Sequence, residues 1–296
     1  MRFFLVSVTW ALTTILSSVP VYACASCGSG GDDPLILYPW EKWKAYTGFS
    51  HTDEFVPITV NGQAGNEFGP QVRDTTTVSL GHSFSNRGFA TVTAPFIVNK
   101  RGQNERSSWG DPMVTARYTL VQQDMADERV PQVQLIAALK SGNVTSVYDY
   151  NDPAQLDVFG SGVPEGRAGV DIWHGMFDWK AGFAQTMTSP LASRKTEFGV
   201  SKNGTTFRST VTIGYGWGDR GKVLVGVNRE QSGQKSLDGI PQADSQKLNH
   251  SAFVTADAKI ERQSMIRLTV SRSAAFAANK NTSQNESVTV AFMRAF

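Results

Sequence analysis

The stretch TFRSTVTIGYGW, residues 206–217, alternates between two kinds of side chain. One face of an extended chain would carry the apolar and aromatic residues, which are Phe207, Val211, Ile213, Tyr215 and Trp217. The opposite face would carry small or polar residues, which are Arg208, Thr210, Thr212, Gly214 and Gly216. This period of two predicts a β-strand with one apolar face.

The strand is followed by a second one of the same kind. After the short link GDRGK, residues 218–222, the run VLVGVNRE at 223–230 alternates again, which predicts an antiparallel hairpin. Similar runs recur along the chain, and no helical period of useful length interrupts them. The last run, SVTVAFMRAF at 287–296, keeps the alternation up to Phe296. The sequence therefore predicts an all-β fold.

The lengths of the links distinguish two all-β architectures, a soluble β-sandwich and a membrane barrel. Short links are expected at 85–88, 218–222 and 257–261, with a medium link at 122–131. Long polar links are expected at 52–73, 99–109, 141–165, 231–246 and 273–286. Membrane barrels show this alternation of short periplasmic turns and long extracellular loops. With two strands placed between residues 166 and 204, we expect an antiparallel transmembrane β-barrel of about twelve strands over residues 40–296.

Aromatic residues near the predicted strand ends are consistent with a barrel. Trp40, Trp43, Tyr46, Trp217 and Phe296 are candidates for the interfacial aromatic girdle that such barrels carry.

The first residues read as a secretory signal. Arg2 precedes an apolar run from Phe3 to Leu16, and Val21 and Ala23 stand at small-residue cleavage spacing. We therefore expect a cleaved signal peptide at 1–23, a periplasmic segment at 24–39, and a place in the outer membrane of a Gram-negative bacterium. The net charge of +2, without a basic stripe, speaks against a nucleic-acid partner.

The motif CASC places Cys24 and Cys27 directly after the expected cleavage point. Three interpretations stay open: a disulfide formed in an oxidising compartment, a redox or metal-linked pair, and lipidation of Cys24. A periplasmic partner could bind through this segment. No histidine follows Cys27, which excludes covalent attachment of a c-type haem.

The histidines do not suggest catalysis or metal binding. His51, His82, His174 and His250 are spread along the chain without ligand spacing, and adjacent His and Ser residues point to opposite faces of a strand. No glycine-rich phosphate loop precedes a helix. We expect no catalytic residues, no metal site and no cofactor.

Three segments resemble a known family. SWGDPMVTARYTL at 108–120, VPQVQLIAALKSG at 130–142 and NTSQNESVTVAFMRAF at 281–296 resemble strands of the outer-membrane proteins linked to meta-pathway phenol degradation. The chain departs from that pattern at LKSG, which lacks the usual proline and threonine, and at Arg294, where an apolar or aromatic residue is usual. The resemblance implies outer-membrane passage of small, often hydrophobic molecules.

These observations predict a channel or transporter with a narrow lumen, since twelve strands fall between the filled eight-stranded barrel and the open sixteen-stranded porin. Its partners would be outer-membrane lipid and a small-molecule solute. The alternative is a secreted, soluble β-sandwich that acts as a binding or adhesion module. The candidate lumen-lining residues are Lys140, Arg208, Thr210, Thr212, Asn228, Glu230, Gln263, Arg267 and Thr269.

Overall fold

The computed structural model describes residues 34–38, 40–58, 61, 71–123, 130–146, 151–152, 155–176, 178–196, 198–218 and 220–296. The expected signal peptide and both cysteines lie outside these residues.

The described residues form seventeen strands. Their bounds are β1 (Trp43–Ile58), β2 (Gln71–Ser85), β3 (Gly88–Arg101), β4 (Asn104–Trp109), β5 (Met113–Val121), β6 (Gln132–Lys140), β7 (Glu165–Met176), β8 (Trp179–Pro190), β9 (Arg194–Thr196), β10 (Gly199–Lys202), β11 (Thr206–Gly216), β12 (Gly221–Ser232), β13 (Ser236–Leu237), β14 (Ile240–Pro241), β15 (Lys247–Glu261), β16 (Ser264–Arg272) and β17 (Thr282–Ala295).

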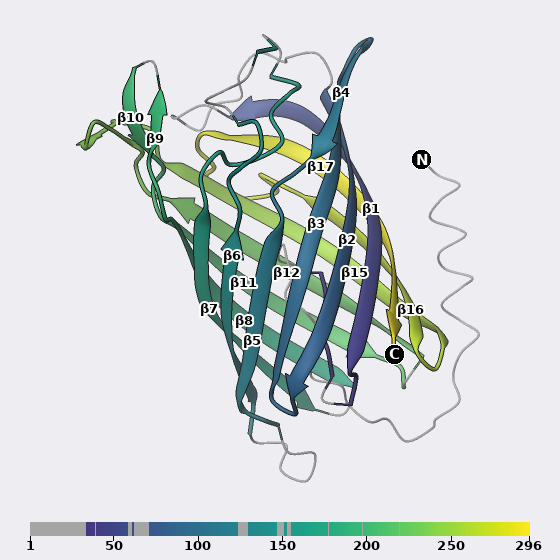
Figure 1. Ribbon diagram of the computed structural model, residues 1–296. Coiled ribbons are helices and arrows are strands. Elements are labelled where there is room, and N and C mark those ends of the chain that lie inside the picture. The colour runs from purple at the N-terminus through teal and green to yellow at the C-terminus, as the bar shows by residue number, and fades with distance from the viewer. Residues whose placement is uncertain are drawn as a thin grey trace.

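Twelve of the described strands close into one antiparallel barrel. The main sheet has 13 strands in the order β2-β1-β17-β16-β15-β12-β11-β8-β7-β6-β5-β3-β4, and β2 also pairs with β3. Since β4 pairs only with β3, the other strands form the ring, and the first strand β1 lies against the last strand β17 (Figure 1). Trp43 and Phe296 exchange backbone hydrogen bonds at this seam. Because a single sheet closes on itself, the soluble-sandwich alternative is wrong, and the twelve-stranded barrel is confirmed.

Side chains alternate between the outer surface and the lumen as the sequence predicts. On β11, Val211 and Ile213 are 54% and 55% exposed on the outside, whereas Thr210 and Thr212 on the inner face are 4% and 2% exposed. Arg294 of β17 also lies on the outer face, with its guanidinium 5.7 Å from the centre of the Phe296 ring. The barrel thus has a mostly apolar exterior.

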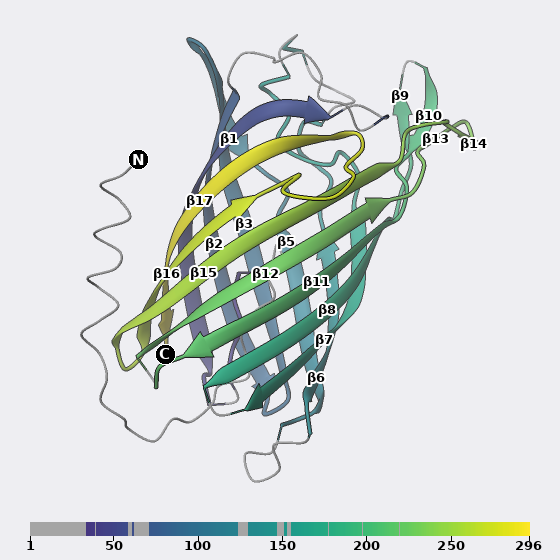
Figure 2. The same ribbon diagram turned by 180° about the vertical axis from the view of Figure 1, so that it is seen from behind.

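Short and long links lie at opposite ends of the barrel. The short-turn end carries the links β2–β3, β5–β6, β7–β8, β11–β12 and β15–β16, and the long-loop end carries the others (Figures 1 and 2). Strands β9, β10, β13 and β14 form a small separate sheet at the long-loop end (Figure 2). The expected pair of strands between 166 and 204 is confirmed by β7 and β8.

Several expected links differ from the structure. Strand β1 continues to Ile58 within the link expected at 52–73, and β17 begins at Thr282 within the link expected at 273–286. The link expected at 257–261 is strand up to Glu261, and the turn consists of Arg262 and Gln263. The link expected at 99–109 is a hairpin, because β3 continues to Arg101, turns at Gly102 with a φ of 58°, and returns as β4. These strand extensions are rich in polar residues, and the sequence pattern therefore did not distinguish them from links. A strand that extends beyond the apolar band of the barrel does not need alternating apolar residues.

Aromatic side chains surround the outside of the short-turn end. Trp43, Phe84, Trp179 and Phe296 are exposed there, and the Trp179 and Tyr215 rings meet edge to face at 5.3 Å. The prediction that Tyr46 belongs to the aromatic girdle is wrong, because its side chain points into the lumen and is buried. Its position in the alternation of β1 puts it on the same face as Lys44 and Gly48.

Candidate functional site in the barrel lumen

The chain that precedes β1 enters the short-turn end of the lumen. Within this N-terminal segment, Pro34–Tyr38, the side chains of Leu35 and Leu37 are fully or almost fully buried. They pack in one apolar cluster with inward-facing residues of the wall, which are Tyr46, Phe89, Ala291 and Met293. Gly81 leaves the room for this contact, because a Cβ at this position would collide with Leu37. The segment therefore narrows the lumen at this end.

Two cations of the wall hold the backbone of the N-terminal segment. Lys44 donates from Nζ to the carbonyl of Ile36 at 3.0 Å and also pairs with Glu41. Arg267 donates to the carbonyl of Pro34 at 3.4 Å. These bonds satisfy two backbone carbonyls of the segment, and a buried carbonyl without a partner costs free energy.

Charged groups form a buried network around Arg267. The carboxylate of Asp257 accepts from Arg267 at 2.7 and 2.9 Å, and it lies 3.2 Å from the Nζ of Lys222. A second buried pair joins Arg117 of β5 to Asp171 of β7 at 3.1 Å. Both carboxylates are almost fully buried, and a charge buried in this way requires an opposite charge beside it.

The middle of the lumen carries an apolar layer formed by Trp173, Leu224 and Phe253, all of which are buried. The Trp173 ring lies over Gly182, where a Cβ would be 2.7 Å from the ring, and the Phe253 ring lies over Gly226. Cross-strand pairs place Gly182 beside Thr212, and Thr212 beside Gly226. Glycines on the neighbouring strands thus allow the two aromatic rings to lie against the wall.

A polar ladder lies between this layer and the long-loop end. Thr210 donates to Asn228 at 2.6 Å, and Asn228 donates to Ser251 at 3.2 Å, so the ladder crosses β11, β12 and β15. A separate hydrogen bond of 3.0 Å joins Thr255 of β15 to Thr269 of β16 at the level of the apolar layer, where Thr255 is paired with Leu224.

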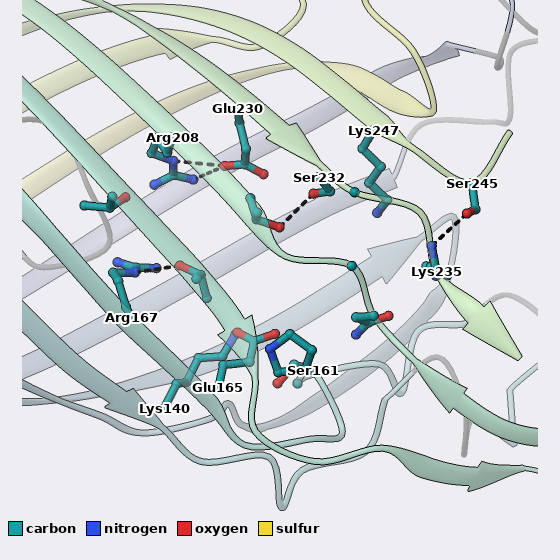
Figure 3. Close-up of a pocket in the computed structure, with 18 residues that line it drawn as sticks. Lys140, Ser161, Glu165, Arg167, Arg208, Glu230, Ser232, Lys235, Ser245 and Lys247 are labelled. Atoms are coloured by element: carbon teal, nitrogen blue, oxygen red, sulfur yellow. Dashed lines mark hydrogen bonds and ion pairs between the residues drawn. The ribbon is translucent and has the colours of Figure 1, made fainter. Parts of the chain in front are cut away.

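The long-loop end of the lumen contains an open pocket of about 320 Å³. Its wall includes Lys140, Glu165, Arg167, Arg208 and Glu230, and the side chains of Arg208 and Glu230 meet across neighbouring strands (Figure 3). Arg208 donates from Nε and Nη2 to the same oxygen of Glu230, at 2.9 Å from Nε. Lys140 and Glu165 pair at 2.6 Å. We call this space the mouth pocket.

The candidate lumen residues from the sequence fall into separate parts of the barrel. Lys140, Arg208 and Glu230 line the mouth pocket. Thr210 and Asn228 belong to the polar ladder below it, and Thr212 lies beside the apolar layer. Thr269 bonds to Thr255 at the level of Leu224, and Arg267 holds the N-terminal segment. Gln263 lies in the exposed turn after β15 rather than on a strand.

Sequence reasoning missed several inward-facing residues, among them Lys44, Arg117, Asp171, Trp173, Lys222 and Asp257. The alternation of each strand would have placed them on the inner face. Nothing in the sequence showed that Arg117 would meet Asp171, which lies 54 positions away. Among the described residues, no group of His, Cys, Asp and Glu side chains is arranged to hold a metal ion, and no helix is long and apolar enough to cross a membrane.

Comparison with known proteins gives a structural match without a sequence match. No family model and no curated protein matches the chain. The resemblance to the phenol-degradation proteins therefore rests on the motifs quoted above.

Among solved structures, the chain is similar to the COG4313 outer membrane channel from Pseudomonas putida F1, with a TM-score of 0.75 and 13% identity over 90% of this chain and 98% of that one. It also matches the CymD monoaromatic hydrocarbon channel, with a TM-score of 0.46 and 8% identity over 86% of this chain and 89% of that one. This second likeness is too distant to support an argument. The chain has the fold of an outer-membrane β-barrel channel.

Proposed function

We propose that the protein is an outer-membrane channel through which small molecules, apolar ones among them, diffuse. The observation that carries this proposal is the reversal of polarity across the barrel wall. Val211 and Ile213 face outward, whereas their neighbours Thr210 and Thr212 face inward. A water-soluble protein rarely exposes an apolar surface of this extent, whereas a barrel in lipid requires one.

The contents of the lumen support passage of apolar solutes. The polar mouth pocket is followed by the layer of Trp173, Leu224 and Phe253, and then by the apolar contacts of Leu35 and Leu37. A solute with an apolar part would meet compatible side chains along the path. The similar fold of the Pseudomonas putida F1 protein, whose description is an outer membrane channel, agrees with this proposal.

Three experiments test the proposal. The protein should stay with membranes during a carbonate and high-salt wash, and the purified barrel should give single-channel steps in planar bilayers. Vesicles that contain it should release or take up benzyl alcohol faster than empty vesicles. A membrane-bound protein that gives neither steps nor faster exchange would contradict the channel function.

We also propose that Cys24 and Cys27 contact a partner in the periplasm. The support is the sequence alone, in which the paired cysteines precede a glycine-rich stretch next to the N-terminal segment. Crosslinking of the whole chain in cells, compared with the variant Cys24→Ser/Cys27→Ser, tests this proposal. An identical crosslinking pattern for the two chains would contradict it.

A further inference from the structure

The mouth pocket carries an excess of positive charge. Among the described residues that line it, the cations are Lys140, Arg167, Arg208, Lys235 and Lys247, and the carboxylates are Glu165 and Glu230. Five positive charges and two negative charges leave a formal charge of +3. Because these groups surround a concave space, their fields add within it, and anions are concentrated there.

The ion pairs of the pocket hold two of the cations in place. Glu230 of β12 accepts both contacts from Arg208 of β11, and Glu165 accepts from Lys140 at 2.6 Å. Each pair joins directly opposed residues of neighbouring strands, so the strand register fixes its position. Both carboxylates of the pocket are thus paired with lysine or arginine, and they offer little repulsion to an incoming anion.

Arg167, Lys235 and Lys247 are the other cations that line the pocket. Arg167 donates from Nε to the hydroxyl of Thr188 at 3.1 Å, which orients its guanidinium in the pocket wall (Figure 3). A guanidinium has a planar fork of N–H groups that matches the two oxygens of a carboxylate. Lys247 begins β15 at the rim, where a mobile ammonium group can approach the same ligand.

The other lining residues suit the head group of a small organic acid. Thr186, Thr206 and Ser232 offer hydroxyl groups that can donate or accept. Along β11, the distance from Arg208 to Thr212 beside the apolar layer spans four residues, or about 13 Å at the rise of a strand. A ligand with a charged head and an apolar body can therefore bind by its head before the body reaches Trp173.

We propose, on the basis of the channel function proposed above, that the mouth pocket selects small organic carboxylates and recruits them to the lumen. Arg167 and Lys247 bind the carboxylate, and the Arg208–Glu230 and Lys140–Glu165 pairs keep the pocket in shape. The substrates are then acidic apolar molecules rather than neutral ones alone.

Binding to the purified, detergent-solubilised full chain tests this inference without any measurement of transport. Titration calorimetry with sodium benzoate is compared with benzyl alcohol, a neutral molecule of similar size, at low ionic strength. We expect benzoate to bind and benzyl alcohol to bind at least about tenfold more weakly, since one charge-assisted hydrogen bond is worth about that factor. Benzoate binding should weaken as salt is raised, because ions screen exposed charges.

Matched variants locate the binding. Arg167→Gln removes one charge from the pocket, and Arg294→Gln makes the same change on the outer face at the other end of the barrel. We expect benzoate affinity to fall about tenfold in Arg167→Gln and in Lys247→Gln, and to stay unchanged in Arg294→Gln. Heat-modified mobility on gels verifies that each variant folds. If Arg167→Gln does not fold, Lys247→Gln at the exposed start of β15 tests the site in its place.

The outcomes separate this inference from the proposed function. Equal binding of benzoate and benzyl alcohol, or equal affinities in Arg167→Gln, Lys247→Gln and Arg294→Gln, would overturn the carboxylate site. A barrel that binds benzoate through Arg167 but gives no channel activity would support the site and overturn the channel function.

Discussion

Arg267 holds the carboxylate of Asp257 with two hydrogen bonds and, with the same guanidinium, reaches the carbonyl of Pro34. One side chain thus stabilises a buried charge of the wall and fastens the segment that narrows the lumen. Strands β15 and β16 set the first contact, because Asp257 and Arg267 are directly opposed in their register.

Loss of this arginine should destabilise the barrel. In Arg267→Gln the buried carboxylate of Asp257 keeps Lys222 as its cationic partner among the described residues. Removal of one partner from a buried pair costs about 3–5 kcal/mol when no other partner remains. We expect a smaller loss of stability than this, because Lys222 remains. It should appear as a lower midpoint of urea unfolding, followed by tryptophan fluorescence in detergent. The double variant Arg267→Gln/Asp257→Asn should recover part of it. If the double variant is less stable than Arg267→Gln, the charge pairing is not the cause.

The N-terminal segment should restrict the pore. Deletion of residues 34–38 removes Leu35 and Leu37 from the lumen and leaves all twelve barrel strands intact, so we expect a folded barrel with higher single-channel conductance. The control Phe198→Ser changes an exposed side chain at the long-loop end and should leave conductance unchanged. Conductance equal to that of the unchanged protein would mean that the segment does not limit the pore.

The apolar layer should limit the passage of aromatic solutes. Trp173→Ala removes a buried ring from the lumen, and such truncations cost about 3–5 kcal/mol in stability. Trp179→Ala removes an exposed ring from the outer face and is the matched control. We expect faster uptake of benzyl alcohol into vesicles for Trp173→Ala alone. A similar rise in both variants would show that the effect does not arise in the lumen.

The outer face of β11 should contact lipid. Ile213→Arg places a charge in hydrocarbon, at a cost of about 2–4 kcal/mol near the midplane. A nitroxide label at 213 should be relaxed by oxygen dissolved in lipid and shielded from a water-soluble nickel complex, and a label at Ser232 in the mouth pocket should show the reverse. Shielding of residue 213 from both reagents would indicate a protein core.

The inner face at the same depth is less tolerant than the sequence pattern predicts. Thr212 points inward but is 2% exposed, and the buried side chains of Trp173 and Leu224 lie near it in the apolar layer. An arginine at 212 should therefore also impair folding, which the alternation alone would not indicate.

The orientation of the barrel in the membrane should follow the lengths of its links. A tag at Gly239, at the tip of the β13–β14 hairpin, should bind antibody on intact cells, and a tag at Arg87 in the β2–β3 turn should not. Labelling of Arg87 alone on intact cells would reverse the orientation.

The sequence by itself determined the strand class, the inward and outward faces and most of the short turns. A period of two depends only on backbone geometry, so residues such as Thr210 and Ile213 could be assigned to faces without knowledge of their neighbours. Closure of β1 against β17 also agreed with the expected even number of strands.

Only the tertiary structure decided which inward-facing side chains meet. Arg117 of β5 contacts Asp171 of β7 across the inner side of the intervening strand β6, and the alternation within a single strand carries no information about contacts between strands. Leu35 and Leu37 stand outside any periodic run, so their place in the lumen arises from an apolar cluster that exists only after the barrel has closed around them.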